Sequence, residues 1–449
     1  MAKILSRLLL VWLSILVVNS SRAQNIITLT WSEVVARTQT DNLDLNIQRQ
    51  DYRYQRLNEW KAVSDFLPTV DYSFRGVNNI ELPEFVLYFG NQAQRIKIGT
   101  DYNFSHVFQL QYPLFLGGLR FANYRIQHNV KKSLSAQLRN KEEEVVLQAL
   151  EAYFNVMLAE KLIEVNQRAY QAARANLEQV EKFYELGAAS QLDYLRAKSR
   201  YSSTIAPLTS AKNAKKLALE NLKFILNLPE SDSLVIADTL AKMEFLEEYQ
   251  TMDLERLQEI ARKNRADLRT VVLQQKATRD QQIISASQFL PSVFLTADVQ
   301  HQAQLETRRV APDDFIRSKS VGLVVQVPLF QGGKRGIEFQ QSRILNKKAR
   351  LQVEQVERAV LLDVENSKNQ FNEAQANLAS LQQAMLEARE ALRLANLTYR
   401  EGISTQVDVL NAQLAYTSSE TQYQQGVFQY NIAQLRLLKA IGKLHSIWS

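Results

Sequence analysis

The spacing of apolar residues changes from a helical period to a period of two and back again, and it does so twice along the chain. Residues 31–66 and 254–289 carry apolar residues at helical spacing, with a candidate break near residues 40–42. Each segment runs into Phe-Leu-Pro, and because proline cannot continue a helix, this motif predicts a switch from helix to strand. Apolar and polar residues then alternate, which predicts a β-hairpin at about residues 69–112 and another at about 292–327.

The two predicted hairpins differ in length. The Phe-Leu-Pro motifs end at Pro68 and Pro291 and are 223 residues apart, whereas the Pro-Leu-Phe-x-Gly-Gly motifs that close the hairpins begin at Pro113 and Pro328 and are 215 residues apart. The first hairpin must therefore hold eight more residues, most simply in the loop between its strands. That stretch, up to about Gly99, is polar and rich in turn residues.

Two long segments are predicted to be single helices. No glycine or proline occurs from Leu119 to Leu186 or from Ile337 to Glu401, so each segment can form a helix of about 100 Å. Pro207 is expected to kink or break the helix that returns from the first of them. The long segments carry apolar heptads, which predicts helices that supercoil against each other: Ala149, Val156, Ile163, Tyr170, Leu177 and Tyr184, and Val364, Phe371, Leu378, Met385, Leu392 and Tyr399.

The same turn motif follows each long helix. It reads Tyr-x-x-Gly-x-x-x-x-x-Asp-x-Leu-x-Ala, with its glycine at Gly187 and Gly402. Glycine supplies the left-handed residue that ends a helix, and Ser190 and Ser404 are candidate N-caps for the helix that follows. The chain is therefore predicted to contain two similar helical hairpins, as the result of an internal duplication.

The N-terminus has the features of a secretory signal. Lys3 and Arg7 precede an apolar core, and a small-residue cleavage box ends at Ala23. A membrane anchor is the alternative, but the apolar core is short for one. Removal of the three cations Lys3, Arg7 and Arg22 lowers the net charge from +7 to +4, and no basic run indicates nucleic acid as a partner. The absence of cysteine excludes disulfides and cysteine–zinc sites.

The chain is predicted to begin with a signal peptide, residues 1–23. Two structural repeats follow, residues 24–228 and 254–442, and residues 229–253 join them. Residues 443–449 form a short tail. The joining segment is mixed in character and is expected to pack beside the helices. Leu234-Val235-Ile236 is a candidate short strand within it.

The predicted strands have one apolar and one polar face, as in a transmembrane β-barrel. Four strands cannot close such a barrel, because the smallest have about eight, and lipid does not tolerate an open sheet edge. The barrel interpretation therefore requires the chain to oligomerise. An ordinary antiparallel sheet with one face in water is the alternative, and the secretory signal and the very long helices favour the barrel.

The whole mature chain resembles the TolC-like outer-membrane efflux family. The resemblance rests on the duplicated halves, the Phe-Leu-Pro and Pro-Leu-Phe-x-Gly-Gly motifs around each hairpin, and the two Gly-x-x-x-x-x-Asp-x-Leu turns. It implies a mainly α-helical tunnel in the periplasm joined to a twelve-stranded barrel, with four strands from each chain of a homotrimer, in the outer membrane of a Gram-negative bacterium. It also implies an exit duct for efflux or type I secretion, working with a periplasmic adaptor (membrane fusion) protein and an inner-membrane RND or ABC transporter.

The resemblance places the two turns at the periplasmic tips. It implies that these turns dock on the adaptor, through Glu185, Leu186, Gly187 and Ala188 and through Glu401, Gly402 and Ile403.

The resemblance also implies a periplasmic gate. Tyr399 matches a tyrosine of the family's gate and Asp408 its first aspartate, whereas Ser404 and Asn411 stand where an arginine and a further aspartate are usual. The loss of both charges leads to the hypothesis of a gate held by hydrogen bonds and packing. The gate candidates of both hairpins are Tyr399, Ser404, Asp408, Asn411, Asp193 and Arg196. For the two aspartates, stabilisation of a helix N-terminus is an equal alternative.

No pattern in the sequence indicates catalysis. It contains no Gly-rich phosphate loop, no cysteine nucleophile and no local Ser/His motif, so an enzyme is not expected. No cofactor and no metal are expected, because the four histidines are scattered. Outer-membrane lipid is a further expected partner. The alternative functions are a periplasmic coiled-coil protein without a pore, which the strand alternation disfavours, and a diffusion porin, which the long helices disfavour.

Overall fold

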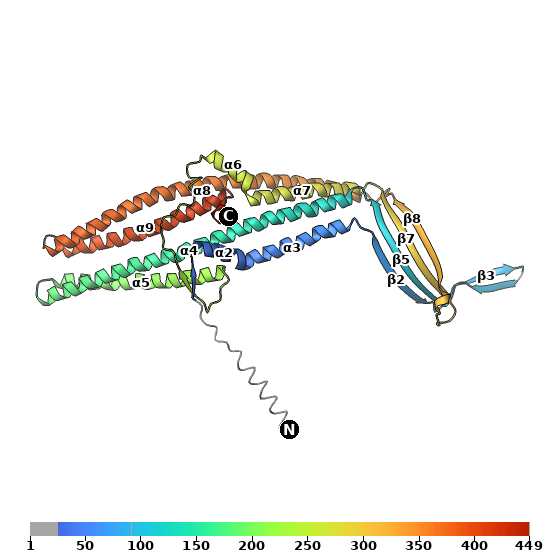
Figure 1. Ribbon diagram of the computed structural model, residues 1–449, viewed down its shortest axis with the longest axis horizontal. Coiled ribbons are helices and arrows are strands. Elements are labelled where there is room, and N and C mark those ends of the chain that lie inside the picture. Colours follow the sequence, from blue (N-terminus) through green and yellow to red (C-terminus); the bar gives the residue numbers. More distant parts are fainter. Residues whose placement is uncertain (1–25, 91, 449) are drawn as a thin grey trace, which may run out of the picture. The chain divides into compact units, whose positions relative to one another are not determined.

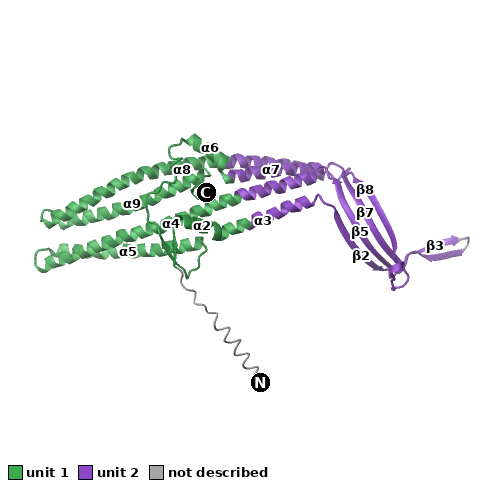
Figure 2. Ribbon diagram, viewed as in Figure 1, with its two compact units in different colours: residues 1–49, 137–266, 357–449 green, residues 50–136, 267–356 purple. Residues whose placement is uncertain are grey.

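The computed structural model describes residues 26–90 and 92–448. The predicted signal peptide lies outside the described residues. The chain divides into two compact units, which Figure 2 distinguishes by colour. One unit comprises residues 1–49, 137–266 and 357–449, and the other comprises residues 50–136 and 267–356.

The second unit contains a four-stranded antiparallel sheet, whose strands are labelled in Figure 1. Its strands are β2 (Thr69–Asn78), β5 (Tyr102–Phe115), β7 (Ser292–Leu305) and β8 (Ile316–Gln326), in the order β2-β5-β7-β8. The two predicted hairpins are confirmed as the pairs β2–β5 and β7–β8. The structure adds the pairing of β5 with β7, which joins the two repeats in one sheet.

The prediction of a polar loop before Gly99 is wrong. Strands β3 (Glu84–Phe89) and β4 (Gln92–Lys97) form a second, separate antiparallel hairpin there. The apolar run in β3 has a strong strand propensity, and Gly90 adopts the positive φ of +65° in the turn. The extra residues of the first repeat therefore build structure of their own, whereas the second repeat turns through the short 3₁₀ helix η1 (Pro312–Asp314).

Two shorter helices precede the sheet strands in each repeat. They are α2 (Trp31–Asp41) and α3 (Leu43–Ser64) in the first repeat, and α6 (Leu254–Asn264) and α7 (Ala266–Ser287) in the second. The break predicted near residues 40–42 is confirmed at Asn42, whose side chain accepts a hydrogen bond from the Leu45 amide at 3.0 Å. Helix α3 ends before Pro68 and α7 ends before Pro291, so both Phe-Leu-Pro motifs mark the predicted helix-to-strand switch.

The two predicted long helices are continuous. They are α4 (Leu119–Glu185) and α8 (Lys334–Arg400), each of 67 residues and thus about 100 Å long. Their heptad positions include residues that are almost fully buried, such as Val156, Val364 and Phe371. The return helices are α5 (Gln191–Ile225) and α9 (Gln406–Ala440). Seam packing therefore supplies the stability that intrinsic propensity cannot supply to such long helices.

Of the predicted kink or break at Pro207, the break is wrong, because α5 runs through this residue without interruption. Proline removes one backbone hydrogen bond. If the helix ended there, the side chains of Leu208 and Ala211, which are buried in the turns that follow, would become exposed to solvent. The burial of these side chains outweighs the single lost bond.

The segment that joins the repeats packs against helices within the first unit. Strand β6 (Ser233–Ile236), the predicted short strand, pairs in parallel with β1 (Ile26–Leu29). Residues 241–245 are bound by two buried amides of α9: Asn431 bonds the Met243 N–H and the Ala241 carbonyl, at 2.9 and 2.8 Å. Gln434 bonds the Phe245 N–H and the Met243 carbonyl, each at 2.9 Å.

Candidate functional site

The four-stranded sheet has two chemically different faces. Residues paired directly across neighbouring strands point to the same face, so the register assigns each side chain to a side. One face carries Tyr72 opposite Phe108, with ring centroids 4.8 Å apart, and Leu295 opposite Leu323. No carboxylate of the four strands lies on this face.

The opposite face of the sheet is polar. Its residues include Asp71, Ser73, Arg75, Asn103, Ser105, Gln109, Gln111, Ser292, Thr296, Asp298, Gln300, Gln302, Ser318, Ser320 and Gln326, with a minority of apolar residues among them. The Ser320 hydroxyl donates to the Asp298 carboxylate across the β7–β8 pair. Strands β2 and β8 each pair with only one strand, so both edges of the sheet are open within this chain.

An arginine fastens each repeat where strand returns to helix. Arg335 donates to the Pro328 carbonyl at 2.8 Å and to the Gln288 carbonyl at 3.1 Å, and its guanidinium lies 5.5 Å from the Phe289 ring centroid. Arg120, its counterpart 215 residues earlier, donates to the Leu114 carbonyl at 3.3 Å and lies 5.1 Å from the Phe66 ring. Both aromatic rings are those of the Phe-Leu-Pro motifs.

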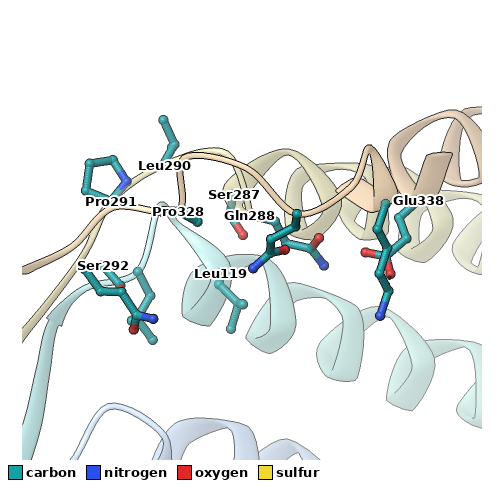
Figure 3. A pocket seen from close by; sticks show the side chains of 12 residues that line it. Leu119, Ser287, Gln288, Leu290, Pro291, Ser292, Pro328 and Glu338 are labelled. Carbon is teal, nitrogen blue, oxygen red and sulfur yellow. Dashed lines mark ion pairs between the residues drawn. The ribbon is translucent and has the colours of Figure 1, made fainter. Parts of the chain in front are cut away.

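A pocket of about 410 Å³ lies at the same junction (Figure 3). Ser292 and Gln326, which pair with each other on the polar face, line it together with Gln288. The Ser287 hydroxyl donates to the Ile284 carbonyl at 2.7 Å and is therefore not held by a base. The lining can solvate polar solutes but offers no activated nucleophile.

The two turns between the long helices have the same backbone. Gly187 and Gly402 adopt φ values of +73° and +76°. The next amide in each turn, that of Ala188 or Ile403, donates back to a carbonyl five residues earlier at 2.7 and 2.9 Å. This geometry is a glycine-terminated helix end. It leaves two apolar side chains projecting into solvent, Leu186 at 80% and Ile403 at 73% exposure.

One of the two predicted N-caps is wrong. Ser190 caps α5 by accepting from the Asp193 amide at 3.1 Å, as predicted, but Thr405 and not Ser404 caps α9. The Ser404 hydroxyl instead bonds the Thr398 hydroxyl at 2.9 Å, inside its own turn. The two turns are equally long, because Thr405 stands three residues after Gly402, as Ser190 does after Gly187, and Ser404 is therefore one residue too early to be the cap.

The two aspartates among the gate candidates are held within their own hairpins. The Thr405 amide and hydroxyl donate to Asp408 at 2.9 and 2.6 Å, and these bonds lower the pKa of its carboxyl. Asp193 accepts from the Ser190 hydroxyl at 2.7 Å and lies 3.6 Å from Arg196. Both aspartates therefore bond the N-cap residue of their own helix, and this local role is the alternative that the geometry favours.

Tyr399 and Asn411 are the gate candidates whose polar ends are available. Neither side chain makes a hydrogen bond to another described residue. Tyr399 is half-buried, and this burial together with the negative charge of Asp193 raises the pKa of its phenol. The phenol therefore remains a neutral donor over the physiological pH range. Asn411 is exposed on the first turns of α9.

The two junction arginines and one buried glutamine were not predicted from the sequence. Arg120 and Arg335 could have been found, because both stand two residues after Gly-Gly at the repeat spacing of 215. Gln406 could not: it is only 5% exposed, and neither its amide oxygen nor its amide nitrogen has a hydrogen-bond partner among the described residues. Within residues 26–448, apart from residue 91, no grouping of metal-binding side chains occurs. No helix in that part of the chain has the length and apolar character of a membrane span.

The sequence pattern of the outer membrane efflux protein family matches residues 64–228 and 257–443, which is most of both repeats. The chain belongs to this family. Membership in the outer membrane efflux protein family places it in the outer membrane, with its long helices extending into the periplasm.

Characterised relatives agree with this assignment. The chain is 25% identical to the outer membrane protein TolC of Escherichia coli over 315 residues, which cover 68% of this chain and 62% of TolC. It is 22% identical to the outer membrane efflux protein BepC of Brucella suis over 435 residues, 92% of this chain and 86% of BepC. The match therefore spans less than two thirds of the E. coli protein but nearly all of BepC.

Solved structures of outer-membrane channels share the fold. The outer-membrane channel OprN superposes with a TM-score of 0.77 over 92% of this chain and 89% of its own, at 17% identity. The Campylobacter jejuni CmeC outer membrane channel superposes with a TM-score of 0.78 over 92% and 86%, at 15% identity. The efflux-family fold, mainly helical with one four-stranded sheet per chain, is thus retained at low sequence identity.

Proposed function

We propose that this efflux-family protein is a passive exit duct, in which three copies close one barrel across the outer membrane. The observation that carries the proposal is the single sheet β2-β5-β7-β8, with one apolar face, one polar face and two open edges. In lipid, unpaired edges are not tolerated. Pairing of β8 with β2 of the next copy satisfies both edges, and three copies supply twelve strands.

The polar face of the sheet then lines the pore. Its side chains are amides, hydroxyls and a few charges of both signs, which suits a water-filled passage for varied solutes. The pocket at the junction opens among residues of the same face, Ser292 and Gln326. No group in it supports chemistry on the cargo, so the duct conducts and the energy for transport comes from elsewhere.

The relatives support the choice of partners. BepC of Brucella suis is an outer membrane efflux protein, and AprF of Pseudomonas aeruginosa is an alkaline protease secretion protein. By the same logic this protein receives cargo from an inner-membrane RND or ABC transporter through a periplasmic adaptor. The projecting Leu186 and Ile403, with Glu185 and Glu401 beside them, are the proposed docking points.

The closed state of the duct is proposed to depend on Tyr399 and Asn411. Both have unused hydrogen-bonding groups, whereas Asp408 and Ser404 are bonded within their own turn. The neutral phenol of Tyr399 lies near Asp193 of the other hairpin. A gate of this kind is held by hydrogen bonds and packing and is only weakly dependent on ionic strength.

A purification and conductance experiment tests the function. Outer membranes are extracted in detergent, and the protein is examined for a heat-modifiable trimer and reconstituted in planar bilayers. A trimer that forms discrete single channels is expected. A monomer that stays in the soluble periplasmic fraction and yields no channels would contradict the duct and favour a coiled-coil protein without a pore.

A further inference from the structure

Cations interrupt the apolar face of the sheet near one end. From the helices outward, the paired rows of β7 and β8 on this face are Val293–Val325, Leu295–Leu323, Ala297–Val321, Val299–Lys319 and His301–Arg317. The first three rows are entirely apolar. The last two bring Arg317 and Lys319 together on the edge strand, with His301 directly opposite Arg317.

The position of these cations along the membrane normal matches the boundary between the apolar band and the lipid headgroups. His301 is eight residues from Val293 along β7, which is about 27 Å at ~3.4 Å per residue. A strand tilted by about 40° raises this row roughly 20 Å along the membrane normal, near the top of an apolar band about 25 Å tall. The helices extend into the periplasm from the other end of the strands, so these cations lie in the outer leaflet.

The chain itself does not neutralise the two cations. Neither Arg317 nor Lys319 forms an ion pair with a described residue, and both are exposed. The strand carboxylates Asp71 and Asp298 lie on the opposite face. His106 lies in the same row but is already engaged, with its Nδ1 2.8 Å from the Tyr72 hydroxyl and its ring 5.1 Å from that of Phe315.

We propose that Arg317 and Lys319, assisted by His301, bind the phosphate of a lipid headgroup in the outer leaflet. This inference rests on the proposed function, because that function makes the apolar face the lipid-facing one. Side chains two residues apart on one strand face are about 7 Å apart at their origins. A guanidinium and an ammonium at that spacing can reach the same phosphate, the first through paired N–H donors and the second as a point charge. Long basic side chains also extend readily to the headgroup level.

The site would occur three times, once at each junction between copies, because β8 is the edge strand that meets the next copy. A phosphorylated lipid bound there contacts the cations through its headgroup and the apolar rows below through its acyl chains. Free inorganic phosphate has only the first of these contacts and should bind far more weakly.

Native mass spectrometry of the purified trimer with diphosphorylated lipid A tests the proposal. Up to three lipids per trimer are expected, and dephosphorylated lipid A or added inorganic phosphate should neither replace nor displace them. The double variant Arg317→Gln and Lys319→Gln should bind lipid A at least about tenfold more weakly, a loss typical of charge-assisted contacts. Arg75→Gln is the matched control, since Arg75 is exposed near the same end of the sheet but on its polar face.

Three results would overturn the site: equal binding by the double variant, an equal loss in Arg75→Gln, or equal binding of dephosphorylated lipid A by the wild-type trimer. The last measurement needs no variant, so it stands even where the double variant does not assemble. The exchange Arg317→Lys with Lys319→Arg keeps both charges and should retain binding. The single-channel conductance of the double variant should be the same as that of the wild type. If the wild-type protein itself forms no channels, the proposed duct is refuted, and the lipid site, which rests on it, is refuted with it.

Discussion

At the scale of single residues, local bonding separates the gate candidates that similarity alone treats alike. Asp408 and Ser404 satisfy their polar atoms within a turn of their own hairpin. Tyr399 and Asn411 do not, and they are the residues from which contacts to other hairpins can be made. A position of the repeated turn motif can therefore serve to bond a helix N-cap, and only its hydrogen-bond partners distinguish this role from a gate contact.

Tyr399→Phe and Asn411→Ala are each expected to favour the open duct. Loss of one hydrogen bond worth about 1 kcal/mol raises the ratio of open to closed channels about fivefold. The measurement is the open fraction and single-channel conductance in planar bilayers. Asp408→Asn is the comparison variant and should leave both unchanged, because Asp408 bonds Thr405. An effect of Asp408→Asn as large as that of Tyr399→Phe would restore the charged gate.

The buried amide of Asn431 is expected to be important for stability. Asn431→Ala leaves the Met243 N–H and the Ala241 carbonyl without partners in a buried position, which should cost about 2–4 kcal/mol. Gln429→Ala, on the exposed side of the same helix, should change stability by less than about 0.5 kcal/mol. Chemical denaturation followed by tryptophan fluorescence compares the two, and equal midpoints would show that the 241–245 segment does not depend on this amide.

At the scale of elements, the junction between strand and helix is built twice from the same parts. The phenylalanine of each Phe-Leu-Pro motif lies against an arginine in the first turn of a long helix. Each arginine also donates to one carbonyl of the bend that precedes its helix, Arg120 to Leu114 and Arg335 to Pro328. The duplication of the sequence is therefore a duplication of the arginine–phenylalanine contact as well.

Arg335→Ala is expected to destabilise the junction. It removes two charge-assisted hydrogen bonds and a stacked guanidinium from a nearly buried site, for a loss of about 2–4 kcal/mol. The neighbouring Lys334 is mostly exposed and pairs only with Glu338 at 3.7 Å, so Lys334→Ala should cost at most about 1 kcal/mol. The melting temperature of the detergent-solubilised trimer measures both. If Lys334→Ala lowers it as much as Arg335→Ala does, the junction is not held by the arginine.

At the scale of the whole molecule, the assignment of the sheet faces decides the function. Leu323 and Val324 are neighbours on the edge strand and are both exposed within one chain, at 65% and 49%. The register places Leu323 on the apolar face and Val324 on the opposite one. A duct requires that only the first of them faces lipid.

Leu323→Arg and Val324→Arg therefore form a matched pair. An arginine on the lipid-facing side of a barrel costs up to about 2–4 kcal/mol at the membrane midplane and less toward the interfaces, whereas the pore side accepts it. Leu323→Arg should reduce the amount of heat-modifiable trimer in outer membranes, and Val324→Arg should leave it close to the wild-type amount. The opposite order would mean that the sheet faces have been assigned the wrong way round.

Much of the architecture was predictable from the sequence because it depends on local patterns. The two long helices follow from uninterrupted heptads, and the helix-to-strand switches follow from proline after Phe-Leu. The errors arose where local signals compete with packing. Pro207 does not break its helix, since buried residues follow it. Thr405 takes the capping position because the two turns are equally long and it is the residue that stands 215 positions after Ser190. The β3–β4 hairpin was missed because polar residues and turn signals surround a short apolar run.

By itself, the sequence determined the duplication, the order of helices and strands, and the alternation that gives the sheet two faces, because these depend on covalent order and on residue spacing. Only the tertiary structure decided that β5 pairs with β7, that two arginines fasten the junctions, and that Arg317 lies beside Lys319 and His301 on the apolar face. Such contacts join residues that are far apart along the chain. No local pattern encodes them, because they form only when the two repeats share one sheet.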